Sequence, residues 1–593
     1  MIAYQAPLRD LRFVLHELLQ IERLSDLPAL AAGTRDSVDA VLEAAARFCE
    51  RELLPLNAPG DGAGCRFEAG QVRTPEGFPA AYERFCAAGW PGLACDPAHG
   101  GQGLPETVNL ALVEMVCSTN LAFGTYPALS HAAYLLLAAY GDEALRARYL
   151  PPLVEGRWAG TMCLTEPQCG TDLGLIRTRA RPAPDATYRL TGAKIFISAG
   201  EHDLTENIVH LVLARLPDAP PGSRGLSLFV VPKFLPRADG APGSRNGVVC
   251  GGIEAKMGLH ASATCQLQFE EAVGWLLGEP NQGLRAMFTM MNVARLAVGI
   301  QGLGLAETAL QGALAYASER RQGHALDRPG RPEAAADPII VHADVRRMLL
   351  RMRAFTEGAR ALILWVGQEL DLSRHHADAE RCREADDLVQ LMTPIIKAFL
   401  TDEGFSAVNL GLQVFGGHGY IREHGMEQLV RDARIGQLYE GTNGIQALDL
   451  VGRKLATGYG RLLRRFFHPA TAFLEAHRDQ PAMEELLRPF GAALGLLQEV
   501  TALLADRASR DQLEGSAAAS DYLRLFGLVA LGYMWVRMAE RALAGQSDAD
   551  DGFHAAKLAT ARFYLRRVLP ETTGLALAIR SGAATIMAPD AFR

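Results

Sequence analysis

The chain has 593 residues, more than one hydrophobic core usually organises, so we expect three or four structural units. Its composition, 49% hydrophobic and 21% charged, is that of a globular protein, and a formal net charge of −8 offers no overall attraction to nucleic acid or to an anionic membrane. The ten cysteines are scattered and form no C-x-x-C pair, which excludes a disulfide scaffold and a zinc module. We therefore expect that the protein binds no metal and that its thiols are reduced, as in a cytoplasm.

Residues 1–160 are predicted to form an N-terminal α-helical domain. Segments such as VDAVLEAAARFCEREL and TVNLALVEMVCSTNLAF repeat apolar residues at the helical spacings. The opening MIAYQAPLRDLRF carries charges where a signal peptide needs an apolar run. We therefore expect a cytoplasmic protein.

Residues 161–280 are predicted to form a middle β domain. Short segments rich in β-branched and aromatic residues, such as YRLTGAKIFISAG, NIVHLVLARL and GLSLFVVPKF, are separated by clusters of Pro, Gly and Asp. Because no helical segments separate these strands, they predict a small antiparallel barrel or sandwich. No G-x-G-x-x-G motif follows a strand and opens a helix, so a Rossmann nucleotide site is not supported.

Helical periodicity returns in residues 281–460 and predicts a catalytic bundle of four or more helices, with a loop at 328–338. Residues 461–593 are predicted to form an additional C-terminal helical domain. Its apolar segment LFGLVALGYMWV is shorter than the roughly 20 residues that span a bilayer. We therefore expect a buried helix or at most a surface contact, and no integral membrane association. The fold class is mainly α with a central β domain.

Two motifs of the middle region indicate a site for a flat cofactor. In MCLTEPQCGTD, Thr165 and Thr171 offer hydroxyls, and Gly170 lets backbone amides approach a ligand; the alternative is a capped turn. In GAKIFISAG, Phe196 and Ser198 lie on one side of a strand by the period of two. An aromatic face beside a hydroxyl suits a heteroaromatic ring, although Phe in a strand is more often core.

Two features of the second helical region indicate phosphate binding. The glycines of QVFGGHGY (413–420) can expose successive amide N–H groups as an anion-binding nest, the alternative being a helix C-cap. Arg320, in YASERRQG, offers a guanidinium for a pyrophosphate, although exposed arginines are common at helix ends.

The stretch QLYEGTNGIQ (437–446) raises a separate question. Its single carboxylate, Glu440, has no second acid, histidine or cysteine within six residues on its C-terminal side. Glu440 is either a solvated loop residue or a general base at the edge of an apolar pocket, where burial raises the pKa of a carboxyl group.

Six motifs in this order resemble the acyl-CoA dehydrogenase family over roughly residues 35–456: T-E-P-x-x-G-[ST]-D, G-x-K-x-[FW]-I-[ST], K-M-G, M-x-x-A-R, Q-x-x-G-G-x-G-[YF] and Y-E-G-T. The opening segment and the helical tail resemble the larger bacterial branch, which includes methylthiopropionoyl-CoA dehydrogenases and related fatty acyl-CoA dehydrogenases. The resemblance implies FAD bound where the helical and β domains meet and across a subunit interface.

The resemblance also implies roles for individual residues. Phe196 stands where the family commonly has Trp, and Gly444 stands where Gln is frequent. The implied FAD contacts are Met162, Leu164, Thr165, Gly170, Thr171, Phe196, Ser198, Arg320, Gln322, Gln413, Gly417, Thr442 and Gly444. Among these, the residues implied to hold the diphosphate, partly from a neighbouring subunit, are Arg320, Gln322, Gln413 and Gly417. The implied substrate contacts are Arg295, Thr171, Tyr439 and Gly441.

By this resemblance Glu440 is the catalytic base, which removes the α-proton of an acyl thioester while the β-hydrogen leaves as hydride to the flavin, giving a trans-2-enoyl-CoA. The backbone N–H of Glu440 and a flavin ribityl hydroxyl bind the thioester oxygen. A minority of relatives carry the base at the position of Ala294, which has no proton acceptor here. We expect fatty acid β-oxidation with an electron-transfer flavoprotein as acceptor.

Alternatives remain for substrate and activity. Medium-to-long acyl chains are expected, with 3-methylthiopropanoyl-CoA as the alternative. A flavin oxidase on the same fold, which passes electrons to oxygen, is a second alternative for the activity. A relative that binds nucleic acid in a stress response would need a basic stripe. Here the positive charges of Arg464 and Arg465 are balanced by Glu484, Glu485 and the acidic run 548–551. We therefore expect no binding of nucleic acid. The tail is predicted to pack on the core and leave a homodimer.

Overall fold

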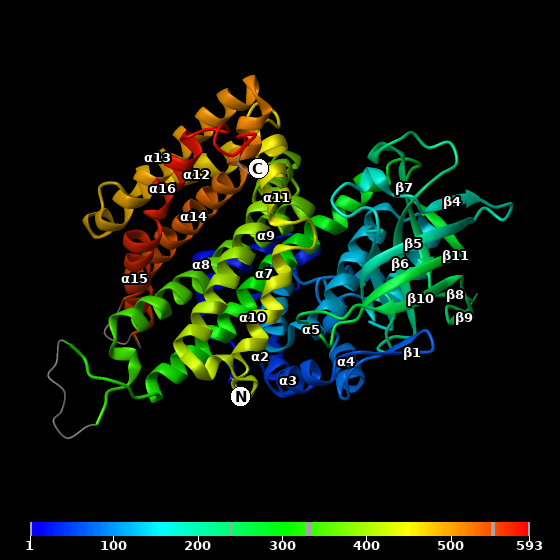
Figure 1. Cartoon of the computed structure of the whole chain (residues 1–593), viewed down its shortest axis with the longest axis horizontal. Coiled ribbons are helices and arrows are strands. Elements are labelled where there is room, and N and C mark those ends of the chain that lie inside the picture. The colour runs from blue at the N-terminus through cyan, green and yellow to red at the C-terminus, as the bar shows by residue number, and fades with distance from the viewer. Residues whose placement is uncertain (1–2, 238, 327–334, 547–551, 591–593) are drawn as a thin grey trace. The chain divides into compact units, whose positions relative to one another are not determined.

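The computed structural model describes residues 3–237, 239–326, 335–546 and 552–590, so the acidic run 548–551 and most of the predicted loop 328–338 lie outside the described residues (Figure 1). The chain divides into two compact units. One contains residues 47–104 and 115–297, and the other contains residues 1–46, 105–114 and 298–593. We refer to them as the β unit and the helical unit.

The β unit is built around a seven-stranded sheet (Figure 1). β11 pairs with β5 and β7, while β6 pairs with β7 and β4, so that β4, β5, β11, β7 and β6 close into a ring. This closure corresponds to a barrel, one of the two predicted alternatives. The seven strands are β3 (Trp158–Cys163), β4 (Arg179–Pro182), β5 (Tyr188–Ser198), β6 (Asn207–Arg215), β7 (Leu226–Pro232), β10 (Val248–Ile253) and β11 (Thr264–Leu277).

The prediction of an antiparallel sheet is wrong at two pairs of strands, because β6 runs parallel to both β3 and β4. β3 runs parallel to β6, with Trp158 opposite Asn207 and Cys163 opposite Val212. Parallel neighbours need a crossover connection, and here the antiparallel pair β4 and β5 lies between them in sequence. All six residues of β3 are buried, and a strand buried on both faces reads as a continuous apolar run that does not reveal its direction.

Around the sheet lie short pairs of strands and several helices. The strand pairs are β1 (Arg66–Glu68) with β2 (Gln71–Arg73) and β8 (Phe234–Pro236) with β9 (Pro242–Arg245). The helices of this unit are α3 (Leu54–Ala63), α4 (Phe78–Ala87) and α6 (Glu143–Val154), with parts of α5 (Glu106–Tyr140) and α7 (Gly283–Glu319). Helices α5 and α7 are long and apolar enough to cross a membrane, but 89% of the most apolar window of each is buried in the protein, as expected of core helices.

The helical unit combines the catalytic bundle with the tail. The bundle comprises the C-terminal part of α7, α8 (Ala343–His375), α9 (Ala379–Phe415), α10 (Met426–Arg434) and α11 (Asn443–Asp449). The tail, drawn from orange to red in Figure 1, comprises α12 (Arg461–His477), α13 (Pro481–Arg510), α14 (Gln512–Gly545), α15 (Phe553–Phe563) and α16 (Glu571–Arg580). Every residue from Leu525 to Val536 is buried, which confirms the predicted buried helix.

A buried charge network ties the tail to the bundle. The Arg360 guanidinium of α8, only 1% exposed, donates to Asp10, to Glu114 at 2.6 Å and to Glu307 at 2.9 Å. Lys557 of α15, fully buried, donates to Glu357 of α8 at 2.7 Å and pairs with Asp10. Buried charges persist only when they are paired and hydrogen-bonded, so this network specifies how the N-terminal segment and tail dock on the bundle.

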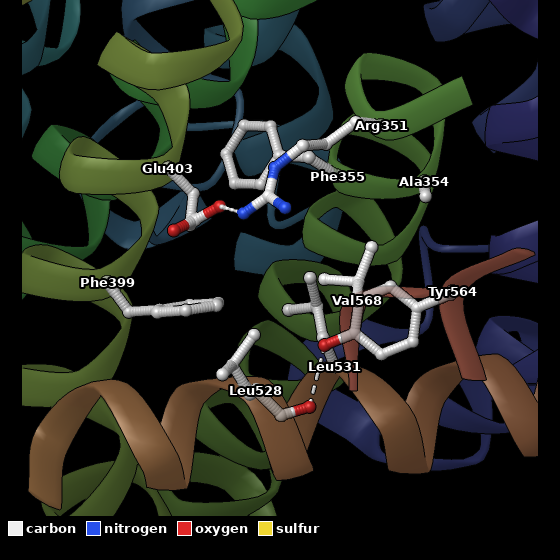
Figure 2. Close-up of a pocket in the computed structure, with 9 residues that line it drawn as sticks. All are labelled: Arg351, Ala354, Phe355, Phe399, Glu403, Leu528, Leu531, Tyr564 and Val568. Carbon is white, nitrogen blue, oxygen red and sulfur yellow. Dashed lines mark hydrogen bonds and ion pairs between the residues drawn. The ribbon is translucent and has the colours of Figure 1, made fainter. Parts of the chain in front are cut away.

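A second charged contact lines a small cavity between the bundle and the tail (Figure 2). Glu403 of α9 accepts from Arg351 of α8 at 3.3 Å and pairs with Arg524 of α14 at 2.7 Å. Figure 2 shows Tyr564 donating to the Leu528 carbonyl, 2.7 Å away. The cavity measures about 10 Å³, close to the room that one water molecule needs, so it does not accommodate an acyl chain.

Candidate active site

The two motifs of the β unit meet through a buried ion pair. Lys194, in β5, donates to the Glu166 carboxylate at 2.8 Å and to the Leu164 carbonyl at 2.9 Å, and the Ile195 N–H donates to the Thr165 carbonyl at 2.9 Å. Glu166 also accepts from Thr178, through its N–H at 3.0 Å and its hydroxyl. The turn at 164–171 and the end of β5 therefore form one rigid surface.

The charges of this pair are mutually stabilised. Burial raises the pKa of Glu166, but the charge of Lys194 and the hydrogen bonds from Lys194 and Thr178 outweigh that effect and lower it to about 2. Burial lowers the pKa of Lys194, and the charge of Glu166 opposes this. Lys194 and Glu166 are 0% and 4% exposed.

A β-bulge turns Phe196 outward. Leu267 pairs with Lys194 and Cys265 with Ile197, so one residue of β11 faces two of β5, and Phe196 has a φ of 58°. Bulges of this kind re-aim side chains beside functional sites. The Phe196 side chain is 59% exposed, whereas Lys194, two residues earlier, points into the core. Phe196 and Ser198 flank the buried Ile197.

The remaining predicted residues of the β unit fall into exposed and buried groups. Gly170 and Thr171 are exposed, and a Cβ on Gly170 would meet no atom closer than 3.9 Å. Met162 is buried in β3, and Leu164 and Thr165 are half-buried. Arg295, in α7, is 6% exposed, and its guanidinium lies 5.9 Å from the Phe288 ring centre.

In the helical unit, Glu440 lies in a left-handed turn directly before α11. Glu440 has a φ of 55° and Gly441 a φ of 81°, a region that non-glycine residues rarely occupy and that costs on the order of 1–3 kcal/mol. Lys397 of α9 donates to the Gly441 carbonyl at 2.8 Å, and Gln446 of α11 donates to the Glu440 carbonyl at 3.1 Å. Surrounding hydrogen bonds thus hold a strained turn.

The flanking residues are held as well. The Tyr439 hydroxyl donates to the Gln301 side chain of α7. Thr442 caps α11 by accepting from the Ile445 N–H at 3.4 Å. A Cβ on Gly444 would meet no atom within 4 Å, so the missing side chain leaves open space at the start of the helix.

The residues predicted to hold a diphosphate lie together but far from Glu440. Arg320 and Gln322 follow α7, Gln413 and Gly417 lie at the end of α9, and all four are exposed. The two helix ends meet where the rings of Tyr316 and Phe415 stack 4.2 Å apart. Gln413 lies sixteen residues beyond Lys397 in α9, roughly 24 Å along the helix. One protomer therefore does not bring this group to Glu440.

The residues present suit FAD. Arg320 is exposed and, among the described residues, its guanidinium makes no ion pair. Gly416 and Gly417 have open space where a Cβ would stand, which allows phosphate oxygens to approach the backbone. Phe196 presents an exposed ring beside the half-buried hydroxyl-bearing Ser198. This donor set matches the phosphates and flat ring of the cofactor.

Four family models match most of the chain. The chain matches the models of the acyl-CoA dehydrogenase N-terminal domain over residues 35–157, middle domain over 161–272 and C-terminal domain over 281–455, and an acetyl-CoA dehydrogenase C-terminal-like model over 466–590. It is 43% identical to the 3-methylmercaptopropionyl-CoA dehydrogenase of Ruegeria pomeroyi, covering 96% of this chain and 97% of that protein. It is 33% identical to the broad-specificity linear acyl-CoA dehydrogenase FadE5 of Mycobacterium tuberculosis, covering 96% of both.

Solved structures show the same fold. The Caenorhabditis elegans ACDH-11 structure in complex with C11-CoA has a TM-score of 0.78 at 19% identity, covering 95% of this chain and 91% of that chain. Butyryl-CoA dehydrogenase from Megasphaera elsdenii has a TM-score of 0.58 at 25% identity, covering 70% of this chain and 98% of that chain. The chain belongs to the acyl-CoA dehydrogenase family. It is an FAD-dependent oxidoreductase that acts on the CH–CH group of an acyl-CoA.

Several residues of the site were not predicted from the sequence. Lys397 and Gln446, which hold the Glu440 turn, are fully buried. A signal for Lys397 was present, because it is the only charge in the apolar helical run LMTPIIKAFL, and a lone charge in such a run is buried with partners. Glu166 lay within a recognised motif, but its long-range partner was not evident.

Proposed function

We propose that this enzyme removes the α-proton and a β-hydride from an acyl-CoA, with Glu440 as the base, to give a trans-2-enoyl-CoA. The observation that carries the proposal is the turn at Glu440, a strained conformation held from both sides by buried donors. Strain held by over-determined contacts is concentrated at active sites. A solvated loop glutamate would not require such support.

Glu440 would act by accepting the α-proton on its carboxylate, which must be close to the reacting carbon and shielded from water. Its backbone N–H would donate to the thioester oxygen and stabilise the negative charge that develops there. FAD, when bound, supplies the acceptor for the β-hydride. Tyr439, Gly441, Arg295 and Thr171 are the proposed substrate contacts.

Two sets of residues would hold FAD. The proposed flavin contacts are Met162, Leu164, Thr165, Gly170, Thr171, Phe196, Ser198, Thr442 and Gly444, and the proposed diphosphate contacts are Arg320, Gln322, Gln413 and Gly417. Gln413 lies roughly 24 Å along α9 from Lys397, which donates to the Gly441 carbonyl. We therefore propose that Arg320, Gln322, Gln413 and Gly417 contact the diphosphate bound by a second copy in a homodimer.

Two substrate classes have comparable support. A medium-to-long straight acyl chain, oxidised in fatty acid β-oxidation with an electron-transfer flavoprotein as acceptor, fits the similarity to a broad-specificity linear acyl-CoA dehydrogenase. The 3-methylmercaptopropionyl thioester, also called 3-methylthiopropanoyl-CoA, is favoured by the 43% identity to an enzyme of that name.

Anaerobic reduction of the purified holoenzyme tests the proposal. A series of acyl-CoAs from C4 to C18, together with 3-methylthiopropanoyl-CoA, should bleach the flavin in proportion to how well each is oxidised, and the product should be the trans-2-enoyl-CoA. Absence of bleaching by every member would reject the proposal. Rapid reoxidation by air with product still bound would favour the oxidase alternative.

A further inference from the structure

We infer that Lys397 is a positioning residue for catalysis, because it fixes the turn that directs the Glu440 carboxylate. The inference rests on the proposed role of Glu440 and deepens it. Lys397 lies in the middle of α9, is 0% exposed and donates to the Gly441 carbonyl and to the Asn443 side chain, each at 2.8 Å. It therefore holds the residues on the C-terminal side of Glu440.

The geometry requires a donor at this place. Two successive residues with positive φ, Glu440 and Gly441, turn the chain so that their carbonyls face α9 and α11. Gln446, also 0% exposed, donates to both carbonyls at 3.1 and 3.3 Å. Without Lys397, the Gly441 carbonyl would lose its shorter hydrogen bond, and a buried polar group without a partner favours rearrangement of its segment.

Further hydrogen bonds hold the turn on both sides; together with Lys397 and Gln446, their residues Asp402 and Asn443 form what we call the clamp. Asp402, five residues after Lys397 in α9, accepts from Gln437 at 2.7 Å and from Asn443 at 2.8 Å. Asn443 also donates to the Thr401 hydroxyl at 2.9 Å. Residues 437 and 443 are thus anchored to one face of α9, and Lys397 holds the segment between them. These contacts leave the backbone of the turn little freedom.

The chemical consequence concerns geometry rather than affinity. A base must be within hydrogen-bond reach of the proton it removes, and a displacement of about 1 Å can cost roughly 10²-fold in rate. Loss of the clamp should therefore reduce the rate of proton removal more than it weakens binding. If Lys397 had only a structural role, its loss would instead lower the stability and the FAD content, and the rate of proton removal would not fall more than binding weakens.

The test uses full-length holoenzyme carrying Lys397→Met, which keeps the length of the side chain but removes its donors. The rate of anaerobic flavin bleaching by saturating acyl-CoA should fall about 10²-fold. FAD content and the Kd for the enoyl-CoA product, read from the flavin spectrum, should stay within about threefold of wild type. In the Glu440→Gln background, Lys397→Met should cause no further loss, because residues that act as a unit are not additive.

The matched control is Lys557→Met, which removes another fully buried helical lysine of the same unit. It should lower the Tm and leave the bleaching rate unchanged. The inference is overturned if Lys397→Met bleaches at the wild-type rate, if the losses multiply in the double variant, or if Lys557→Met slows bleaching equally. If Lys397→Met does not fold, Gln446→Leu takes its place with the same expected outcomes. A wild-type rate in Glu440→Gln would instead reject the proposed base.

Discussion

The Lys194 ammonium lies 2.8 Å from the Glu166 carboxylate, and neither side chain is exposed by more than 4%. The pair joins the turn that precedes Gly170 to the strand that presents Phe196. Removing one member of a buried pair leaves an unpaired charge and costs about 3–5 kcal/mol. Its position suggests that the predicted flavin-contacting surface depends on this single ion pair.

The Lys194–Glu166 pair predicts a specific pH dependence. Because the pKa of Glu166 is lowered to about 2 from a usual value near 4.5, its stabilising contribution is complete above pH 4.5 and is lost as the pH falls through about 2. Glu166→Gln should lack this contribution at pH 7, with a lower Tm and reduced FAD content. Its Tm should also depend less on pH between 4.5 and 2, measured by circular dichroism.

The matched control is Glu271→Gln, which removes an exposed carboxylate from the same sheet. Glu271 pairs with Arg181 at 2.7 Å, but its side chain is 55% exposed, and exposed ion pairs contribute little. This variant should retain the wild-type Tm and FAD content. Equal effects of Glu166→Gln and Glu271→Gln would contradict the importance assigned to the buried pair.

Glu440→Gln should bind FAD and acyl-CoA yet lose most turnover. The amide is nearly isosteric but cannot accept the α-proton, and loss of a general base typically costs about 10²–10⁴-fold in rate. Steady-state dye reduction measures the effect. Glu499→Gln, which changes a 67% exposed side chain on α13, should behave as wild type. Near-wild-type turnover of the purified Glu440→Gln protein would refute the assignment of Glu440 as the general base.

Arg320→Ala should weaken FAD retention. An exposed guanidinium at the end of α7 is suited to bidentate contact with a diphosphate, and we propose that this diphosphate is bound mainly by the second subunit. The flavin remaining after dialysis, read by absorbance, should fall relative to wild type. Arg347→Ala, at an exposed arginine paired with Asp344, should retain flavin. Equal retention by Arg320→Ala and wild type would reject the phosphate role.

Local sequence patterns predicted much of the fold, but they did not predict which distant segments pair with one another. The continuous apolar run in α14 was predicted as a buried helix and is one. A helix that is buried on all sides is apolar on all sides, and this is visible in the sequence. The parallel pairing of β3 with β6 was missed, because strand direction is not encoded in a run of buried residues. The bulge at Phe196 was likewise missed, since its cause is a register shift against β11.

The site shows the same division. Motif order predicts roles for Glu440 and the glycines, because the features that point to them are local in the sequence. Lys397 and Gln446 were missed as supports because their role appears only when α9 and α11 are packed against the turn. The Arg360 network unites side chains from five parts of the chain, from Asp10 to Lys557, and no spacing rule connects such distant charges.

The last prediction concerns the tail, residues 461–593, which we propose forms a domain that completes the bundle and limits assembly to a dimer. Truncation at Gly460 would remove Lys557 from Glu357 and Asp10, and Arg524 from Glu403. It would also expose the parts of α8 and α9 that α14 covers. Unpaired buried charge and newly exposed apolar surface should cause aggregation or loss of FAD.

Size-exclusion chromatography with light scattering, together with the flavin spectrum, measures both effects of the truncation. Lys557→Met in the full-length chain separates them, because it removes the charge contact but leaves the apolar surface covered. It should remain a dimer with a lower Tm. A soluble, fully active tetramer from the truncated chain would show that the tail neither stabilises the bundle nor restricts assembly.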